Sequence, residues 1–415
     1  MKIWLINNYN MLPEHGPLNR NYFLAKYLQR LGHEPVVFAG SHPHNTKLQL
    51  IEGKERYLVY REKPFPWVLV KTRNYAESKK QRVISMFEFY RNVKKAAKHF
   101  EKPDVIVGSS AHPLAALAAI RLGKKYGCRK IVEVRDLWPE SIFVYSKRLS
   151  KKSLLAKLLY RGERWIYKKA DAVIFTMPGG ADYIKEQGWD REHGGPIDLK
   201  KVYHVNNGVD LEAFDKNAED YRYEDSELDD EGIFKIVYAG AISRVNKVGT
   251  LLDTAKLMNP KTVRFLIFGD GSELADLKDR AVKEGITNVR FKGLIEKRFI
   301  PSIVKRADLN VVHWETSPLI RYGDSSNKSF EYFAAGKPVL FTTRPNYSVV
   351  ERFRCGLTTE DQKPETIAAA IDSIIHLTPE ERETMCKNAR KAAEAYDFKE
   401  LSKKLAEIAE KLIRE

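Results

Sequence analysis

The sequence predicts an α/β protein made of two doubly wound, Rossmann-like domains. The chain of 415 residues exceeds what one hydrophobic core usually organises, which favours two domains. Short apolar runs alternate with amphipathic segments in both halves, and a strongly acidic stretch separates the halves. Strands that alternate with helices indicate parallel sheets, whose ligands bind beyond the carboxyl ends of the strands. We therefore expect the two domains to face each other across a cleft.

The first half begins with a strand, a loop that contains proline and glycine, and a helix that Gly32 closes. The same order then repeats. Strands are expected at residues 3–8, 35–40, 105–110, 131–136, 172–177 and 201–209. Helices are expected at residues 19–32, 114–127, 147–169 and 181–188. The first domain should therefore span residues 1–209.

Residues 210–232 have the composition of an acidic inter-domain connector, because 11 acidic residues stand there against Lys216 and Arg222. A second α/β series then begins. Its strands are expected at residues 234–240, 263–271, 289–295, 309–314 and 338–343. The second domain should span residues 233–395. Residues 379–415 have a helical pattern, and we expect a C-terminal helix at 396–415 to cross back and pack on the first domain.

The cysteines and the apolar runs bear on the cellular compartment. Cys128, Cys355 and Cys386 are odd in number and far apart, which argues against a disulfide framework or a zinc site and fits a reducing cytoplasm. The opening residues do not form a secretory signal, and no apolar run approaches the roughly 20 residues that span a bilayer. We expect a cytoplasmic protein that is soluble or bound at a surface.

The net charge of +16 is concentrated in two segments of the first half. Residues 61–99 hold eleven basic and three acidic residues, and residues 147–169 hold nine and one. Both segments interleave aromatic residues with the cations, a composition that suits an anionic membrane surface. Nucleic acid is the less favoured partner, because neither segment matches a helix-turn-helix, RNP or zinc-finger pattern.

Residues 65–70, FPWVLV, are expected to form an apolar, membrane-facing loop, because prolines on both sides of Phe65 argue against a core strand. Phe65, Trp67, Lys71 and Arg73 are the expected membrane contacts. The helix at residues 147–169 leaves two alternatives open. Its leucines and Trp165 could pack in the core, or they could dock on the membrane.

The loop after the first strand of each domain is where a doubly wound sheet presents backbone amides to an anion. The first of these loops contains Gly16 between His15 and Arg20. In the second, Gly240 lets the backbone turn, and Arg244 and Lys247 precede a helix. Taken alone, each pattern also fits an ordinary turn with surface cations.

Residues 325–339 carry a further polar motif. Lys328 and Glu331 stand one helical turn apart, so the two side chains share a helix face. Gly336 followed by Pro338 ends that helix. A cation and a carboxylate are therefore presented together, and together with the glycine loops they suggest a phosphate-bearing ligand.

Several strings occur in an order typical of one enzyme family: EVRDLWPES (133–141), HVNNGVD (204–210), IFGDGSELADL (267–277) and SPLIRYGDSSNKSFEYFAAGKPV (317–339). With them, nearly the whole chain resembles glycosyltransferase family 4, retaining nucleotide-sugar enzymes of the GT-B fold. The last string, RDLWPES and residues 75–89 are similar to bacterial N-acetylfucosaminyl transferases of surface-polysaccharide assembly.

The resemblance implies a role for the second domain in holding the nucleotide diphosphate. Arg244 and Lys247 would neutralise the phosphates and stabilise the charge that develops on the leaving group. Glu331 would accept from the ribose hydroxyls, and Asn327 and Lys328 would lie beside the diphosphate and the donor sugar. The residues expected to bind the donor are Gly16, Gly240, Arg244, Lys247, Leu294, Asn327, Lys328 and Glu331.

Two positions depart from the family pattern. Members commonly carry a second glutamate eight residues before the position of Glu331, but this chain has Gly323 there, so that role is unfilled or shifted to Asp324. Many members also place a histidine after the strand that ends here in Arg135 and Asp136. Asp136 is expected either to contact donor or acceptor as a catalytic residue or to cap a helix. His112, which follows the preceding strand, and Arg135 are expected near the acceptor.

The resemblance therefore implies a retaining glycosyltransferase that moves a sugar, an N-acetylated or deoxy hexosamine, from a UDP-sugar. The acceptor would be a saccharide or a polyprenyl-diphosphate-linked carrier in cell-surface polysaccharide synthesis, such as O-antigen. The enzyme would be peripheral on the inner face of the cytoplasmic membrane. It would need no metal and no cofactor, because a paired-aspartate motif after a strand is missing and cations take the place of the ion.

Two other functions stay open from the sequence. A non-hydrolysing UDP-sugar 2-epimerase shares the two-domain architecture. A non-catalytic protein that binds nucleotide-sugars or polyanions would also fit, given Gly323 in place of the family glutamate.

Overall fold

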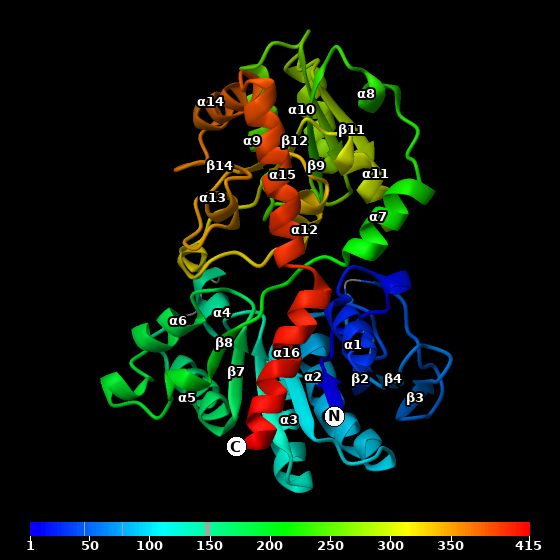
Figure 1. Cartoon of the computed structure of the whole chain (residues 1–415), viewed down its shortest axis with the longest axis vertical. Coiled ribbons are helices and arrows are strands. Elements are labelled where there is room, and N and C mark those ends of the chain that lie inside the picture. Colours follow the sequence, from blue (N-terminus) through cyan, green and yellow to red (C-terminus); the bar gives the residue numbers. More distant parts are fainter. Residues whose placement is uncertain (45, 77, 146–149) are drawn as a thin grey trace. The chain divides into compact units, whose positions relative to one another are not determined.

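The computed structural model describes residues 1–44, 46–76, 78–145 and 150–415 (Figure 1). The chain folds into two compact units. Unit 1 comprises Met1–Asn206 together with Phe398–Glu415, and unit 2 comprises Asn207–Asp397. Each unit is a mostly parallel sheet with helices, so the predicted α/β class with two Rossmann-like domains is confirmed. The basic segment at 147–169 begins at residues 147–149, which lie outside the described part of the chain.

The described part of unit 1 contains an eight-stranded sheet with the order β3-β4-β2-β1-β5-β6-β7-β8. All neighbouring strands are parallel except β3 and β4. The chain order reverses between β1 and β5, which is where doubly wound sheets bind ligands. The strands are β1 Lys2–Ile6, β2 Glu34–Gly40, β3 Tyr57–Tyr60, β4 Trp67–Val70, β5 Val105–Ser109, β6 Arg129–Val134, β7 Ala172–Phe175 and β8 Val202–His204.

Helices α2 and α3 pack with the strands of unit 1 around one core cluster that includes Trp4, Phe38 and Phe89. Helix α3 begins with Pro113, whose missing N–H is harmless at a helix start, and ends where Gly127 takes a left-handed φ of 63°. The helices are α1 Arg20–Arg30, α2 Lys79–Ala96, α3 Pro113–Tyr126, α4 Glu140–Tyr145, α5 Leu154–Lys169, α6 Gly180–Glu186 and α16 Phe398–Arg414, with 3-10 turns η1 Pro13–His15, η2 Ala97–His99, η3 Arg191–His193 and η4 Leu199–Lys201.

The C-terminal helix α16 packs on unit 1, as the sequence predicts. The hydroxyl of Ser402 donates to the carbonyl of Leu24 in α1 at 3.3 Å, and the Phe23 and Phe398 rings stack with centroids 5.2 Å apart. Residues 396–397 separate this helix from α15, so the helical pattern of residues 379–415 is interrupted once.

The prediction of a membrane-facing loop at residues 65–70 is wrong. Phe65 and Trp67 are buried, and Trp67 begins β4, an interior strand between β2 and β3. Proline is tolerated here because Pro66 stands before the strand and contributes a carbonyl, which accepts from the Val37 N–H at 3.0 Å. The Phe65 ring packs on Tyr22 with centroids 5.4 Å apart.

The two cations expected in the same loop are held by neighbouring groups of unit 1. The Lys71 ammonium donates to the carbonyl of Gly53. The Arg73 guanidinium pairs with Glu88 at 2.7 Å. Lys71 and Arg73 therefore follow a buried strand and do not extend an exposed apolar tip.

The described part of unit 2 contains a six-stranded, all-parallel sheet with the order β11-β10-β9-β12-β13-β14. Its order reverses between β9 and β12, which predicts the ligand site of this unit. The strands are β9 Phe234–Ala239, β10 Val263–Phe268, β11 Val289–Gly293, β12 Leu309–Val312, β13 Val339–Phe341 and β14 Gly356–Thr358. The helices are α7 Leu211–Asp220, α8 Ser226–Asp229, α9 Gly249–Lys256, α10 Leu274–Lys283, α11 Ile300–Lys305, α12 Asn327–Ala334, α13 Val349–Phe353, α14 Pro364–Ile375 and α15 Pro379–Ala395, with η5 Lys297–Phe299 and η6 Pro318–Tyr322.

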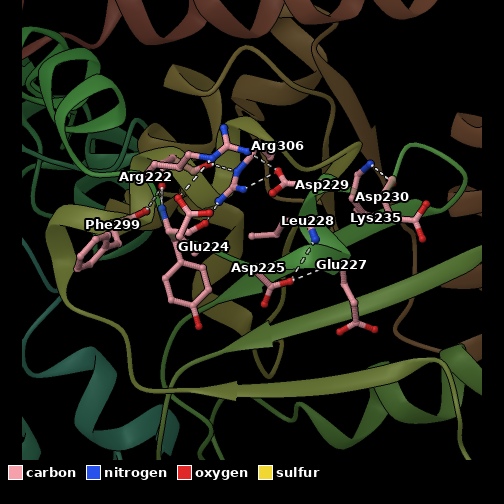
Figure 2. A network of polar contacts seen from close by, with 12 residues as sticks. Arg222, Glu224, Asp225, Glu227, Leu228, Asp229, Asp230, Lys235, Phe299 and Arg306 are labelled. Atoms are coloured by element: carbon pink, nitrogen blue, oxygen red, sulfur yellow. Dashed lines mark hydrogen bonds and ion pairs between the residues drawn. The ribbon is translucent and has the colours of Figure 1, made fainter.

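The acidic segment expected to connect the domains is folded as part of unit 2. Figure 2 shows carboxylates of this segment beside arginine and lysine side chains. Asp229 pairs with Arg222 at 2.7 Å and with Arg306 at 2.8 Å. Lys292 of β11 pairs with Asp225 at 2.6 Å and with Glu227 at 2.8 Å. The acidic residues of this segment therefore form ion pairs with arginine and lysine side chains of unit 2.

Candidate active site

At the carboxyl edge of the unit 2 sheet, the loops after β9 and β10 are joined through their backbones. The N–H of Gly240 donates to Phe268 O at 2.9 Å, and the N–H of Ile242 donates to Asp270 O at 2.8 Å. Gly269 has a left-handed φ of 140°, and a Cβ there would clash with the Gly240 carbonyl. Glycine at position 269 therefore permits the close approach of the two loops.

The ammonium of Lys328 lies directly over the β9 loop. A Cβ built on Gly240 would stand 2.5 Å from Lys328 Nζ, so the glycine makes room for the cation. The ammonium also lies 3.4 Å from the hydroxyl of Tyr238 and 4.7 Å from the centroid of that ring. Burial lowers the pKa of Lys328 to about 8, although Asp324 and Glu331 oppose the shift. A bound anion would raise this pKa again, because it favours the charged form.

The backbone of the β9 loop is strained at Lys247, which has a left-handed φ of 44°. The imidazole Nε2 of His313 lies 3.0 Å from the carbonyl oxygen of Lys247, and Nδ1 lies 2.6 Å from the Thr342 hydroxyl. The Lys247 ammonium pairs with Glu315 at 2.9 Å. Arg244 in the same loop is exposed and has no ion-pair partner within the described ranges. Both cations expected to meet the diphosphate thus project from one loop.

Helix α12 begins at Asn327 and carries Glu331, which pairs with Lys297 of η5 rather than with Lys328. Leu294, which follows β11, is 78% exposed. The structure therefore places Lys328 beside Gly240, and it places Leu294 and Glu331 on neighbouring segments of the same unit.

The structure gives a physical reason for Gly323. Its φ of 95° is left-handed, and a glutamate there would be strained. Asp324 does not stand free to replace the family glutamate. Its carboxylate accepts from the Ser326 N–H at 2.9 Å and from the Ser329 hydroxyl at 3.0 Å. Asp324 therefore holds the start of α12.

In unit 1, Arg20 at the end of the loop after the first strand is a buried structural arginine and not a surface cation. Its Nε pairs with Glu133 at 2.8 Å, and its two terminal nitrogens donate to the carbonyls of Val205 and Asn206. Burial alone would raise the pKa of Glu133, but Arg20 and Arg135 hold that pKa below its usual value. Gly16 lies in the loop before α1, where a Cβ would meet the Met11 sulfur at 2.6 Å.

A cluster of histidine and tyrosine side chains lies at the carboxyl ends of β1, β2, β4 and β5. The ring of Tyr9 contacts His44 and His112 with centroids 4.7 and 5.4 Å apart. The Tyr75 hydroxyl lies 3.0 Å from His44 Nδ1, and the Tyr75 and His42 centroids are 4.5 Å apart. We call these five residues the His/Tyr cluster. Arg82 of α2 donates to the Tyr9 hydroxyl at 3.2 Å.

The His/Tyr cluster contains buried polar atoms that have no hydrogen-bond partner among the described residues. They include both ring nitrogens of His112 and Nε2 of His42, and Asn8 beside the cluster adds its amide nitrogen and oxygen. Burial lowers the pKa of His112 to about 3 and that of His44 to about 4, so both rings are neutral near pH 7. Buried polar groups without partners are rare and point to a ligand or to bound water.

The sequence identified His112 but missed Tyr9, His42, His44 and Tyr75. The available signal was their position, since each follows the end of a strand near the switch point of the sheet. Asp136 and Arg135 follow β6 at the same edge, with Asp136 exposed. No group of three or more His, Cys, Asp or Glu side chains is placed to hold a metal within residues 1–44, 46–76, 78–145 and 150–415.

Both units match family models of sugar-transferring enzymes. Residues 19–213 match Glycosyltransferase Family 4, and residues 233–376 match Glycosyl transferases group 1. The chain is a glycosyltransferase of the GT-B fold. This assignment favours transfer over the epimerase and the non-catalytic binding protein that the sequence left open. Of the helices in the described ranges, none combines the length and the apolar composition of a membrane span.

Two curated relatives bear glycosyltransferase names. The chain is 23% identical to the probable glycosyltransferase WbjE of Pseudomonas aeruginosa over 73% of this chain and 75% of WbjE. It is 24% identical to the putative teichuronic acid biosynthesis glycosyltransferase TuaH of Bacillus subtilis over 59% of this chain, and it spans 58% of TuaH. The N-acetylfucosaminyl transferase subgroup stays a prediction.

Solved structures confirm the GT-B fold of this glycosyltransferase. Sucrose-phosphate synthase from Thermosynechococcus elongatus is 17% identical with a TM-score of 0.72, covering 100% of this chain and 99% of that one. Anabaena HepE in complex with UDP and glucose is 16% identical with a TM-score of 0.68, and the match covers 99% of this chain and 100% of HepE. WaaG, a glycosyltransferase involved in lipopolysaccharide biosynthesis, is 15% identical with a TM-score of 0.65, covering 99% of both chains.

Proposed function

We propose that this glycosyltransferase moves a sugar from a UDP-sugar, with retention of configuration, to a lipid-linked or saccharide acceptor of cell-surface polysaccharide synthesis. The observation that carries the proposal is the Lys328 ammonium above Gly240, at the carboxyl edge of β9 where the sheet order reverses. A cation in this position meets the diphosphate of a donor. HepE, which was solved in complex with UDP and glucose, supports the choice of nucleotide.

The donor would be held by groups from three segments of unit 2. Lys328, with Arg244 and Lys247 from the β9 loop, would stabilise the negative charge that builds up on the departing diphosphate. Glu331 would accept hydrogen bonds from the ribose hydroxyls, and exposed Leu294 would offer apolar contact to the base. Asn327 at the start of α12 and Gly16 of unit 1 stay predicted donor contacts.

The acceptor would bind at the His/Tyr cluster of unit 1. A neutral imidazole both donates and accepts a hydrogen bond, and an aromatic ring packs on the apolar face of a sugar, so the cluster suits a hydroxyl-rich ligand. The unpartnered nitrogens of His112 would then find partners on the acceptor. Arg135 and Asp136 at the end of β6 would add a cation and a carboxylate, and Asp136 is the proposed catalytic contact.

The mechanism would need neither a protein nucleophile nor a divalent ion. The leaving phosphate would take the proton of the acceptor hydroxyl, and the cations of the β9 loop and α12 would stand where other transferases place a metal. We propose an N-acetylated or deoxy hexosamine as the sugar, because residues 317–339 resemble N-acetylfucosaminyl transferases. TuaH and WaaG, which are described as glycosyltransferases of teichuronic acid and lipopolysaccharide biosynthesis, support a surface-polysaccharide acceptor. We propose in addition that a polyprenyl diphosphate carries this acceptor at the inner face of the cytoplasmic membrane.

The test is a screen of UDP-sugars with the purified full chain in EDTA, with and without a polyprenyl-diphosphate-linked saccharide. We expect one or a few donors to release UDP in an acceptor-dependent manner, and the product should keep the anomeric configuration of the donor. A sugar that changes configuration while still attached to UDP would instead indicate the epimerase. Absence of UDP binding by calorimetry would overturn the proposal.

A further inference from the structure

Helix α5 presents leucines to solvent. The side chains of Leu154, Leu155 and Leu158 are 83%, 51% and 66% exposed. The inward face of α5 is occupied instead by residues such as Ala156 and Ile166. The leucines therefore contribute little to the core of unit 1. Of the two alternatives that the sequence left open for this helix, core packing is wrong for these three side chains.

Exposed cations flank the leucines on the same helix. Lys157, Arg161, Arg164 and Lys168 recur every three or four residues and are all exposed, so they form one stripe along α5. The one acidic residue of this helix, Glu163, is buried, and its carboxyl group accepts from the hydroxyls of Tyr167 and Tyr183 at 2.6 and 2.7 Å. The exposed surface of α5 is thus basic and apolar without a neutralising carboxylate.

The basic stripe borders a surface pocket of about 520 Å³ between α5 and the segment after α6. Three cations line the pocket, and Trp189 and Tyr160 supply aromatic walls; the lining residues are Lys157, Tyr160, Arg161, Arg164, Gln187 and Trp189. Two guanidinium groups beside an ammonium offer several charge-assisted donors to one phosphate. The pocket therefore has the chemistry of a phosphate-headgroup site next to an apolar ridge.

We propose that α5 docks the enzyme on an anionic membrane leaflet. Leu154, Leu155 and Leu158 enter the interfacial region, and a lipid phosphate headgroup occupies the pocket lined by Arg161 and Arg164. An amphipathic helix with leucines and flanking cations binds the interface by apolar burial together with attraction to anionic lipid. This inference rests on the proposed function, because a lipid-linked acceptor lies at such a surface.

Other occupants fit the α5 surface less well. A second copy of the chain would bring two basic stripes together, and like charges repel. Nucleic acid would neutralise the cations but would leave the leucines in water, since aliphatic side chains provide no stacking surface for bases. An anionic bilayer satisfies both the cations and the leucines.

The experiment is co-sedimentation of the full chain with vesicles of phosphatidylcholine alone or mixed with phosphatidylglycerol. We expect binding to the anionic vesicles, partial release in high salt, and little binding to phosphatidylcholine alone. The double variant Leu154→Ser/Leu158→Ser should lose the salt-resistant part. In Arg161→Gln/Arg164→Gln the partition coefficient should fall about five-fold for each cation removed.

A matched control lies on α10, where Val282 is 82% exposed and Lys278 and Lys283 are exposed. The variant Val282→Ser/Lys278→Gln/Lys283→Gln should bind vesicles like the parent. Thermal unfolding of every variant checks that the fold is intact. The inference is overturned if the parent stays in the supernatant at low salt, or if the α5 variants bind like the parent. It is also overturned if the chain binds DNA or itself through α5 but does not bind vesicles.

UDP affinity, measured by calorimetry on the same preparations, separates the two proposals. If the parent binds UDP but does not bind anionic vesicles, the docking inference is overturned and the proposed transfer is not affected. Vesicle binding without UDP binding overturns the proposed transfer alone.

Discussion

His313 holds the carbonyl oxygen of Lys247 at 3.0 Å from its Nε2. Because a carbonyl only accepts, Nε2 carries the proton and Nδ1 accepts from the Thr342 hydroxyl at 2.6 Å. Burial lowers the pKa of His313 to about 4, so the ring stays neutral and the donor stays in place near pH 7. The strained backbone of Lys247, with a φ of 44°, is thereby tied to the end of β12.

His313 is therefore a positioning residue for the β9 loop, and His313→Ala should weaken UDP binding without removing a ligand contact. We expect the UDP affinity to fall roughly ten-fold, and the free energy of unfolding to fall by about 1–3 kcal/mol because a buried carbonyl loses its donor. Calorimetry and denaturant unfolding measure the two effects. His313→Gln, which can still donate, should restore part of the affinity. Unchanged affinity in His313→Ala would contradict the positioning role.

Lys328→Gln should lower transfer more than Arg244→Ala does. The ammonium of Lys328 is half-buried over Gly240, whereas Arg244 is exposed and screened by water. Removing one cation that stabilises a leaving group costs roughly 2–4 kcal/mol of transition-state stabilisation, which appears in kcat/KM. Lys363→Gln, at a side chain 74% exposed, is the control. Equal rates in Lys328→Gln and the parent would place the diphosphate elsewhere.

Most of the fold follows from local sequence patterns, because strand and helix periods and the glycines that end helices act over a few residues. Residues 65–70 show where such a pattern misleads. Proline commonly interrupts strands, but Pro66 stands just before β4, where its carbonyl accepts a hydrogen bond from Val37. Packing on Tyr22 contributes to the burial of Phe65. Which strand neighbours β4 is set by contacts distant in sequence.

The candidate site was predictable where its residues lie within short motifs. The sequence predicts Lys328 from residues 317–339 and predicts Arg244 and Lys247 from the loop after the first strand of the second domain. The structure places Lys328 over that loop. The His/Tyr cluster was not predictable in the same way, since its five residues come from the ends of four strands that are distant in sequence. The partner of Glu331 was also hidden, because Lys297 lies 34 positions away in the chain.

Glu331→Gln should reduce UDP affinity about ten-fold, because a neutral amide accepts more weakly from the ribose hydroxyls than a carboxylate does. Lys297→Met tests whether the ion pair orients Glu331. Its effect on UDP affinity should be smaller and in the same direction. Glu383→Gln on α15, which removes an exposed carboxylate, is the matched control. If Glu331→Gln binds UDP like the parent, Glu331 serves only its pair with Lys297.

Glu163 gives unit 1 a pH-dependent stability. Burial raises the pKa of this carboxyl to about 8, although hydrogen bonds from Tyr167 and Tyr183 oppose the shift. In the unfolded chain the carboxyl has an ordinary pKa of 4.5. Between pH 4.5 and 8 the folded state therefore binds a proton that the unfolded state has released, and stability falls as the pH rises through this window.

Glu163→Gln should consequently stabilise the protein at pH 8, because the amide is neutral in both states. We expect a gain on the order of 2–4 kcal/mol in the free energy of unfolding at pH 8, most of which should vanish at pH 5. Denaturant unfolding of the parent and the variant at both pH values measures the difference. Glu383→Gln again provides the control, since an exposed carboxylate should show no such pH dependence. A constant difference between Glu163→Gln and the parent from pH 5 to pH 8 would mean that Glu163 does not change its protonation on folding.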